Sequence, residues 1–208
     1  MKINNKEYPK VLIIGNTFDE YTGAGITLTN LFKEWPQSCI AVASNNLDLD
    51  YCNRCRPCHS YYTFGSNARR DSTPFIKNNV KSNSTIKNYL KDAVIKTGLL
   101  DFRNIYQLDS EFLSFYDEFN PDIVYSALGG VPIMRFFKKL NKVRNFRLVV
   151  HIWDEFLERF NNRWFCSLWV RYADNLFKKI LQKEDIVCLA IGEKMAGEYE
   201  KRYHKKFS

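Results

Sequence analysis

Residues 10–35 read KVLIIGNTFDEYTGAGITLTNLFKEW, and this stretch decides the fold. Val11–Ile14 are four apolar, mostly β-branched residues, and Gly15 follows them at once. A run this short and this apolar is typical of a strand that is buried on both faces of a sheet. From Ile26 the spacing becomes helical, and the apolar residues predicted to share one helix face are Leu28, Leu31, Phe32 and Trp35.

The loop between this strand and this helix ends in Gly23-Ala24-Gly25. In a doubly wound α/β domain this loop lies at the carboxyl edge of the sheet, where ligands bind and where the free N–H groups of the helix attract phosphates. The dinucleotide fingerprint G-x-G-x-x-G is not met, because Leu28 stands where its third glycine belongs. Two interpretations remain: a loop that approaches a substrate, or a glycine-rich turn without a ligand.

Similar segments alternate along the rest of the chain. Strands are predicted near residues 11, 39, 122, 147 and 186, with a short one at 61–64, and helices over 84–98, 110–119, 132–140, 161–182 and 193–203. Strands that alternate with helices indicate a mostly parallel sheet with helices on both faces. At 208 residues a single domain is the default. We therefore expect one three-layer, Rossmann-like α/β domain.

Two later strands also end in residues that suit a binding site. The strand near residue 122 runs into Gly129 and Gly130, and the next helix begins at Pro132. The strand near residue 147 ends in a polar group made of His151, Trp153, Asp154 and Glu155. Because parallel strands end at one edge of a sheet, we expect both groups at the ligand-binding edge.

The segment CNRCRPCH at 52–59 places Cys52, Cys55 and Cys58 three residues apart, next to His59. Three thiolates at this spacing suit zinc or part of an iron–sulfur cluster. A fourth ligand is hard to find, because adjacent Cys58 and His59 seldom reach one ion. We expect residues 44–60 to form a polar, exposed loop with reduced thiols and no bound metal, while metal binding and a disulfide remain as alternatives.

The composition favours an anionic partner, since 31 Lys and Arg face 23 Asp and Glu and give a net charge of +8. Nucleic acid, a phospholipid surface and a phosphorylated substrate all fit this charge, as does simple solubility. No apolar run is long enough to span a membrane, and the N-terminal run is too short for a signal peptide. We therefore expect a cytoplasmic protein, with peripheral contact at the inner membrane face left open.

The helix over 161–182 bears most directly on the membrane question. Its predicted apolar stripe contains Trp164, Phe165, Leu168, Trp169, Tyr172, Leu176, Ile180 and Leu181, and Arg163, Arg171, Lys178, Lys179 and Lys183 line the other side. A basic amphipathic helix of this kind lies on an anionic membrane or packs on the sheet with a solvated basic face. The exposure of Trp164 and Trp169 distinguishes these two arrangements.

The opening stretch, together with PDIVYSALGG at 121–130, RLVVHIWDEF at 147–156 and AIGEKMAGEYEKRYHKKFS at 190–208, resembles the retaining family four of nucleotide-sugar glycosyltransferases, which have the GT-B fold. The resemblance implies that residues 1–208 are the N-terminal, acceptor-side domain and that the C-terminal donor-binding domain is absent from this chain. It implies transfer of a sugar from a nucleotide-sugar to a glycan, lipid-linked sugar or lipid acceptor. It also implies no metal, no cofactor other than the nucleotide-sugar as co-substrate, and no nucleic acid partner.

The resemblance further implies roles for single residues. His151 would act in catalysis near the transferred sugar and the phosphate leaving group, where a donated hydrogen bond stabilises developing charge. Gly23, Ala24, Gly25, Gly129 and Gly130 would approach the substrates, and Asp154 and Glu155 would accept hydrogen bonds from acceptor hydroxyls. The alternatives are a structural His151, a non-catalytic membrane-surface or metal-binding module, and half of a nucleotide-sugar epimerase.

Overall fold

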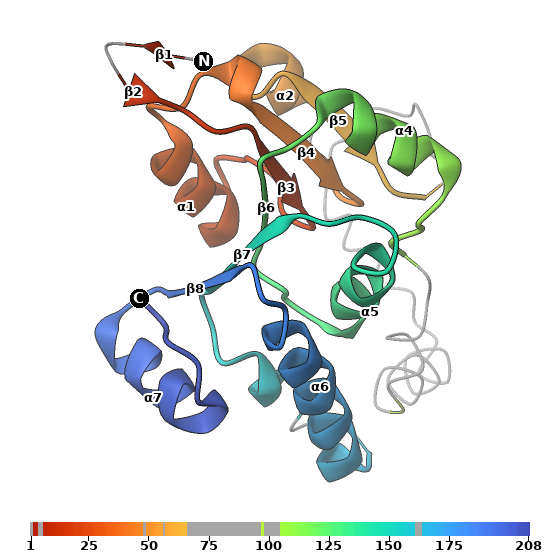
Figure 1. The fold of residues 1–208 in the computed structure, drawn as a ribbon, viewed down its shortest axis with the longest axis vertical. Coiled ribbons are helices and arrows are strands. Elements are labelled where there is room, and N and C mark those ends of the chain that lie inside the picture. The colour runs from red at the N-terminus through yellow and green to blue at the C-terminus, as the bar shows by residue number, and fades with distance from the viewer. Residues whose placement is uncertain are drawn as a thin grey trace, which may run out of the picture.

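The computed structural model describes residues 2–3, 6–47, 49–55, 57–65, 97, 105–160 and 164–208. Its centre is a sheet of six parallel strands, in the spatial order β5-β4-β3-β6-β7-β8 (Figure 1). Their bounds are β3 (Val11–Ile14), β4 (Ile40–Ser44), β5 (Ser60–Thr63), β6 (Ile123–Ser126), β7 (Arg147–Ile152) and β8 (Ile186–Ala190). Two short strands, β1 (Lys2–Ile3) and β2 (Lys6–Glu7), form a separate antiparallel pair.

Helices cover both faces of this sheet, as the sequence predicts. The described helices are α1 (Gly23–Phe32), α2 (Leu49–Cys55), α4 (Ser110–Phe119), α5 (Val131–Leu140), α6 (Cys166–Leu181) and α7 (Glu193–Tyr203), with 3-10 turns η1 (Gln37–Cys39) and η3 (Phe156–Phe160). Side chains of α4, α5, α6 and α7 share one core cluster, and side chains of α1 and α2 share another. The protein is therefore a three-layer, Rossmann-like α/β fold.

The central strand shows why the opening stretch decides this architecture. All four side chains of β3 are at most 3% exposed, because Leu12 and Ile14 face one core cluster and Val11 and Ile13 face the other. β3 pairs with β4 on one side, with Leu12 opposite Ala41, and with β6 on the other. A strand that lies between two others and under helices on both faces must be apolar throughout.

The strand order creates a reversal between β3 and β6. The chain runs from β3 outward through β4 to β5, then returns to β6 on the other side of β3 and continues outward to β8. In open α/β sheets the crevice at such a reversal, outside the carboxyl ends of the strands, is where ligands bind. The loops after β3 and β6 meet at this point.

Local sequence accounts for the helix ends that frame the sheet. Asp109 caps α4 by accepting a hydrogen bond from Phe112 N at 2.8 Å, and Asn120 ends that helix in the left-handed conformation. Pro132 stands in the first turn of α5, where its missing N–H costs nothing. These signals, together with the apolar spacing, explain why α4, α5 and α7 have nearly the predicted bounds.

Two predictions of local structure are wrong. Residues 44–60 are not all loop, because α2 forms within them and buries Cys52. The helix predicted over 161–182 begins only at Cys166 in the described residues, because Trp164 and Phe165 form a turn before it. Of the apolar residues predicted to share a helix face, Leu31, Trp164, Phe165 and Leu168 are exposed. The helix predicted over 84–98 lies outside the described residues, apart from the helical Thr97.

Candidate functional site

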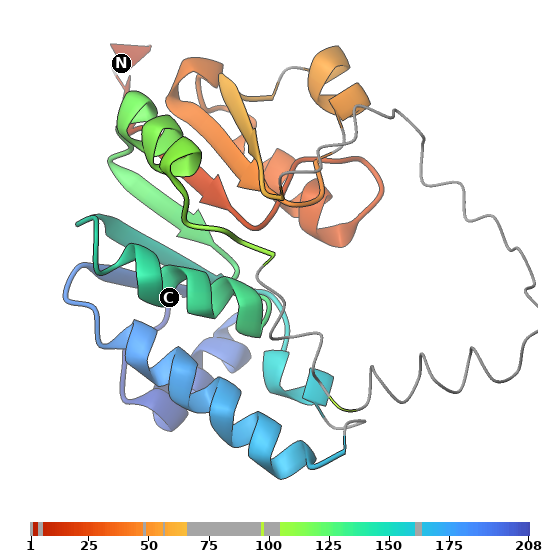
Figure 2. The ribbon, with the colours of Figure 1, turned by 90° about the vertical axis from the view of Figure 1, so that its right-hand side faces the viewer.

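A cleft of about 440 Å³ opens at the reversal between β3 and β6. The loops after β3, β6 and β7 form its walls, together with the start of α5 and η3. Figure 2 shows η3 on the side to which the strand arrows point, which is the carboxyl edge of the sheet. Polar or charged side chains in the lining come from Asn16, Tyr106, Ser126 and Asp154, and aromatic ones include Trp153 and Phe156. No Lys or Arg belongs to the described lining.

The two strand-end loops are fixed by backbone geometry that the sequence encodes locally. Gly15 has a φ of +89°, a conformation that favours glycine, and a Cβ there would also lie 2.9 Å from Ile133 Cδ1, which would have to shift. Leu128 is buried in the left-handed conformation with a φ of 48°, which costs about 1–2 kcal/mol for a residue with a side chain. This turn carries Gly129 and Gly130 into the cleft wall.

Two further hydrogen bonds hold the cleft in shape. Ala127 N donates to Asn16 Oδ1 at 3.4 Å, which links the loop after β6 to the loop after β3. The Tyr106 hydroxyl donates to Asn45 Oδ1 at 3.0 Å, and its ring packs edge-on against Phe64. Burial raises the pKa of Tyr106 to about 12, so this hydroxyl stays protonated and remains a donor at neutral pH.

The glycine loop before α1 is organised around a carboxylate rather than an empty phosphate site. Asp19 is 8% exposed and accepts hydrogen bonds from Tyr21 N at 2.9 Å and Thr22 N at 2.6 Å. Thr22 in turn caps the helix by accepting from Gly25 N at 2.9 Å. The N–H groups of Thr22 and Gly25 are thus already bonded, and the Asp19 side chain lies beside the helix start.

Each residue of Gly23-Ala24-Gly25 has a different environment. Ala24 lines the cleft, whereas a Cβ on Gly23 would meet no other atom within 4 Å. Gly25 is buried, and a Cβ there would overlap the carboxyl group and backbone nitrogen of Asp19. Glycine at position 25 therefore makes room for Asp19. This geometry argues against a phosphate at the start of α1.

His151 does not belong to the described lining of the cleft, whereas its neighbours Ile152 and Trp153 do, and its predicted role in catalysis stays a prediction. Its Nδ1 lies 2.7 Å from the Tyr125 hydroxyl, and its ring stands edge-on to the ring of Trp153. Residues alternate between the faces of a strand, so His151 points toward the α1 side while Ile152 reaches the cleft. Its contact with the cleft runs through Trp153, which does line it.

Burial sets the charge state of this pair. It lowers the pKa of His151 and raises the pKa of Tyr125, so both groups are neutral near pH 7. The nearby Trp153 N–H lowers the pKa of Tyr125 slightly, against the larger effect of burial. Within the described residues this buried N–H has no hydrogen-bond partner. The Tyr125 hydroxyl and Nδ1 therefore share one hydrogen bond between neutral groups, and the histidine tautomer decides which of the two donates.

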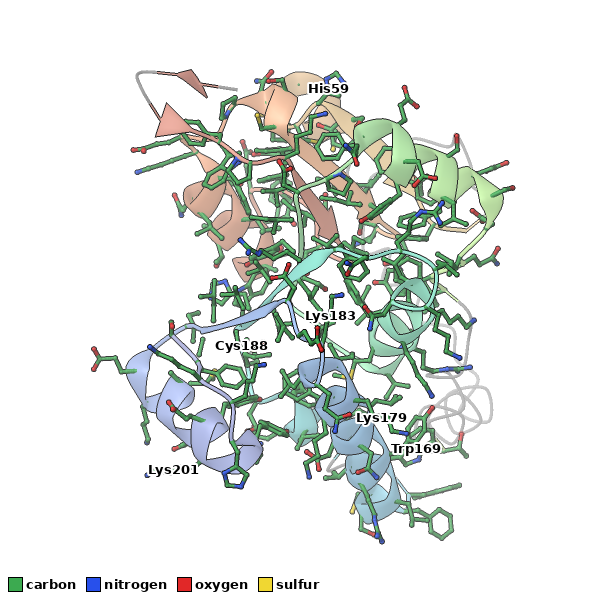
Figure 3. The ribbon with its side chains drawn as sticks, viewed as in Figure 1. His59, Trp169, Lys179, Lys183, Cys188 and Lys201 are labelled. Carbon is green, nitrogen blue, oxygen red and sulfur yellow. The ribbon has the colours of Figure 1, made fainter. Side chains whose placement is uncertain are left out.

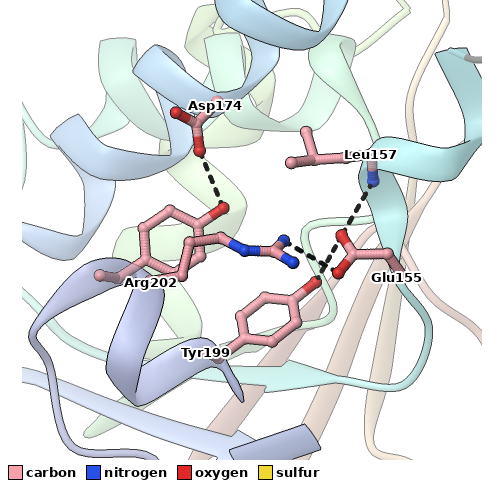
Figure 4. Close-up of polar contacts among 6 residues, drawn as sticks. Glu155, Leu157, Asp174, Tyr199 and Arg202 are labelled. Carbon is pink, nitrogen blue, oxygen red and sulfur yellow. Dashed lines mark hydrogen bonds and ion pairs between the residues drawn. The ribbon is translucent and has the colours of Figure 1, made fainter.

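The two carboxylates that follow β7 have separate surroundings. Asp154 is exposed and lines the cleft. Glu155 turns away from it and joins α7, where Arg202 Nη1 donates to Oε2 at 2.9 Å and the Tyr199 hydroxyl donates to Oε1 at 3.2 Å (Figure 4). Glu155 thus links the last helix to the turn after β7, and its predicted contact with an acceptor stays a prediction.

The cysteine segment is more buried than expected. Cys52 and Cys58 are at most 5% exposed, Cys55 is exposed, and the Cys58 thiol donates to Ser60 O at 3.3 Å. Desolvation raises the pKa of Cys58 to about 12, which keeps it a thiol. Among the described residues no three His, Cys, Asp or Glu side chains are placed to hold a metal ion. That the chain binds no metal stays a prediction.

Sequence reasoning missed several residues that shape the cleft. Asn16 follows Gly15 directly, so its place after the first strand was a usable signal. Tyr106 and Phe160 reach the cleft only through tertiary packing, for which the sequence offers no local cue. The structure brings together Ala24, Gly129, Gly130 and Asp154 from the predicted set and leaves Gly23, Gly25, His151 and Glu155 outside the lining.

Comparison with known proteins adds no name to this site. No protein-family model matches the chain, and no curated protein matches it. In the part of the chain that the structure describes, no helix has the length and apolar character needed to cross a bilayer. The functional argument therefore rests on the Rossmann-like fold and on the cleft at its strand reversal.

Proposed function

We propose that this chain supplies the acceptor side of a glycosyltransferase, which moves a sugar from a nucleotide-sugar to a glycan, lipid-linked sugar or lipid acceptor. The observation that carries the proposal is the cleft at the strand reversal, which combines aromatic side chains with oxygen acceptors. Sugars present apolar C–H faces and many hydroxyls, so they suit a site with rings such as Trp153 and acceptors such as Asp154.

The charge of the cleft favours the acceptor over the donor. The described lining holds the Asp154 carboxylate and no Lys or Arg, and the buried Asp19 carboxylate lies at the start of α1. A nucleotide diphosphate would meet negative charge here, whereas a neutral polyhydroxylated molecule would not. In this proposal Asp154 accepts hydrogen bonds from acceptor hydroxyls, and the Asn16 amide and the backbone of Gly129 and Gly130 orient the sugar.

Saccharide binding to the chain itself tests the acceptor side. Saturation-transfer NMR with a panel of mono- and oligosaccharides should detect binding to the wild-type chain that Asp154→Ala weakens. A transferase assay then follows release of the free nucleotide from nucleotide-sugar donors, using the protein together with any donor-binding partner. If the panel shows no saccharide binding, or if Asp154→Ala binds as tightly as wild type, the proposal is wrong.

A second candidate function, peripheral attachment to an anionic membrane, is favoured by a different observation. Trp164, Phe165 and Leu168 are between 52% and 75% exposed at the start of α6, and we call them the apolar tip. Arg171 and Lys179 are exposed further along the same helix. Exposed aromatic side chains beside basic ones suit the interface of an anionic leaflet, either for a lipid-linked acceptor or for a non-catalytic surface module.

A further inference from the structure

A small basic crevice lies between the ends of α5 and α6, at the start of β7 and so at the opposite edge of the sheet from the cleft. Its volume is about 60 Å³. Apolar side chains such as Phe137, Phe146 and Leu148 form its floor. The polar residues that line it are Lys138, Asn141, Lys179 and Lys183, and we call this site the lysine crevice. No acidic residue belongs to its described lining.

The lysines of this crevice differ from the basic residues around them. Three neighbouring cations are paired: Lys178 with Asp174 at 2.7 Å, Arg144 with Asp117 at 2.6 Å and Arg147 with Asp185 at 2.9 Å. Within the described residues, no such ion pair is recorded for the three lysines that surround the crevice. Three of the surrounding positive charges are thus held in ion pairs, whereas Asp185 and Glu184 act on Lys183 only through space and no ion pair within the described residues is recorded for the crevice lysines.

Lys183 is held in place at the crevice. Its Nζ lies 4.5 Å from the centre of the Phe146 ring, and this cation–π contact restrains an otherwise mobile side chain. Partial burial lowers the pKa of Lys183, while Asp185 and Glu184 act in the opposite direction. An anion in the crevice would favour the charged ammonium, so the site gains electrostatic stability when it is filled.

Helix dipoles explain these lysines only in part. Lysine in the last turn of a helix is stabilised by the negative end of the dipole, which accounts for Lys138 and Lys179 one at a time. The carbonyls of the last turns are already bonded, however, since Phe137 O accepts from Asn141 N and Ile180 O accepts from Lys183 N. The dipole does not account for three ammonium groups and an amide around one hollow.

We propose that the lysine crevice binds a phosphoryl group, as inorganic phosphate or as a phosphate monoester. The ends of α5 and α6 and the segment after α6 bring three lysines and Asn141 to the lining of a space about the size of one tetrahedral oxyanion. Hydrogen bonds between charged partners are among the strongest in proteins, and the apolar floor excludes water from one side. The proposal does not rest on glycosyl transfer, because the crevice and the cleft lie at opposite edges of the sheet.

Titration calorimetry with inorganic phosphate tests the site in the full chain. Chloride is exchanged for phosphate at constant ionic strength, so that general screening does not change. Lys179→Gln and Lys183→Gln should each weaken binding about tenfold, because each removes one charge-assisted hydrogen bond. Lys201→Gln, on the distant helix α7, is the matched control and should change affinity less than about twofold (Figure 3). Lys179 is exposed, so its variant keeps the test valid even if Lys183→Gln unfolds the protein.

The source of the phosphoryl group is tested with vesicles. Vesicles that contain phosphatidic acid, a phosphate monoester, are compared with phosphatidylserine vesicles of equal surface charge. Preference for phosphatidic acid that free phosphate competes away, and that Lys179→Gln removes, assigns the site to a lipid headgroup. Calorimetric binding without that preference assigns it to a soluble phosphorylated ligand. The proposal is overturned if phosphate gives no more heat than chloride, or if the two crevice variants bind phosphate as wild type does.

Discussion

The Tyr125 hydroxyl lies 2.7 Å from Nδ1 of His151, and the two rings stand nearly perpendicular. Burial lowers the pKa of His151, so the folded protein takes up this proton at a lower pH than the unfolded chain does. The contribution of His151 to stability is therefore complete above the unfolded pKa of about 6.5 and is lost as the pH falls through the folded value.

We expect His151→Gln to lose less unfolding free energy than wild type when the pH falls from about 7.5 to about 5. Denaturant unfolding at the two pH values measures this difference. His59 is exposed, and His59→Gln serves as the matched control that should follow wild type. Equal pH dependence in wild type and His151→Gln would show that the histidine is not protonated more readily in the unfolded chain.

Replacing Gly23 or Gly25, both in the first turn of α1, by alanine should change the unfolding free energy in different ways. Gly25→Ala forces a Cβ into the Asp19 carboxyl group and backbone, which must shift, so we expect a loss of about 1–3 kcal/mol of unfolding free energy. Gly23→Ala meets open space in the first turn of α1 and should be neutral or stabilising by up to about 1 kcal/mol. Denaturant midpoints compare the two variants, and equal midpoints would contradict the packing described for Gly25.

This pair also shows how far the sequence predicts the site. The glycine loop was correctly placed at the carboxyl edge, because a buried apolar run followed by glycine is a local signal. The close approach of Asp19 to Gly25 was not predictable from the sequence. Position 25 needs glycine because the Asp19 carboxyl group, which is hydrogen-bonded to Thr22, occupies the space of a side chain. The sequence left open whether Gly25 approaches a ligand or only forms a turn, and the structure adds that a side chain there would meet Asp19.

The same limit explains the other differences. β3 was predicted closely because a short, wholly apolar run followed by glycine is a local signal, and α7 because its apolar residues recur at helical spacing. The apolar residues Trp164 and Leu168 also fit such a period, but no described element packs on them, and periodicity alone does not reveal whether a partner exists. Because parallel strands end at one edge of a sheet, the sequence placed His151 and Glu155 correctly at the carboxyl edge. Their hydrogen-bond partners Tyr125 and Arg202 come from distant parts of the chain, and the sequence did not indicate them.

Asp154 and Glu155 are neighbours with opposite expected effects. Glu155→Gln weakens its bonds to Arg202 and Tyr199, and because the Arg202 side chain is 38% exposed we expect a loss of only about 1 kcal/mol of stability. Asp154→Asn should leave stability within about 0.5 kcal/mol but reduce saccharide binding, since the carboxylate lines the cleft. Thermal unfolding and saturation-transfer NMR on both variants separate the roles. A loss of saccharide binding in Glu155→Gln at unchanged stability would restore Glu155 to the acceptor site.

The last prediction concerns whether the apolar tip inserts into a membrane. Trp164 is 52% exposed, whereas Trp169 is partly buried and its Nε1 donates to Thr97 O at 3.1 Å, so only the first tryptophan is available to lipid. Burying an exposed aromatic or leucine side chain in the interface contributes about 1.5–3 kcal/mol at most, and each basic residue near an anionic leaflet adds about 1 kcal/mol.

The two contributions differ in their response to salt. Roughly 0.5 M salt reduces the Debye length to a few ångströms and removes the electrostatic part, while apolar insertion persists. Co-sedimentation with anionic vesicles should therefore fall but not vanish at high salt for the wild-type chain. The variant Trp164→Ser with Phe165→Ser should keep the low-salt binding and lose the salt-resistant part, while Trp169→Phe should retain both. Complete loss of wild-type binding in high salt, or an unchanged salt-resistant part in the double variant, would show that the apolar tip does not enter lipid and that any attraction is purely electrostatic.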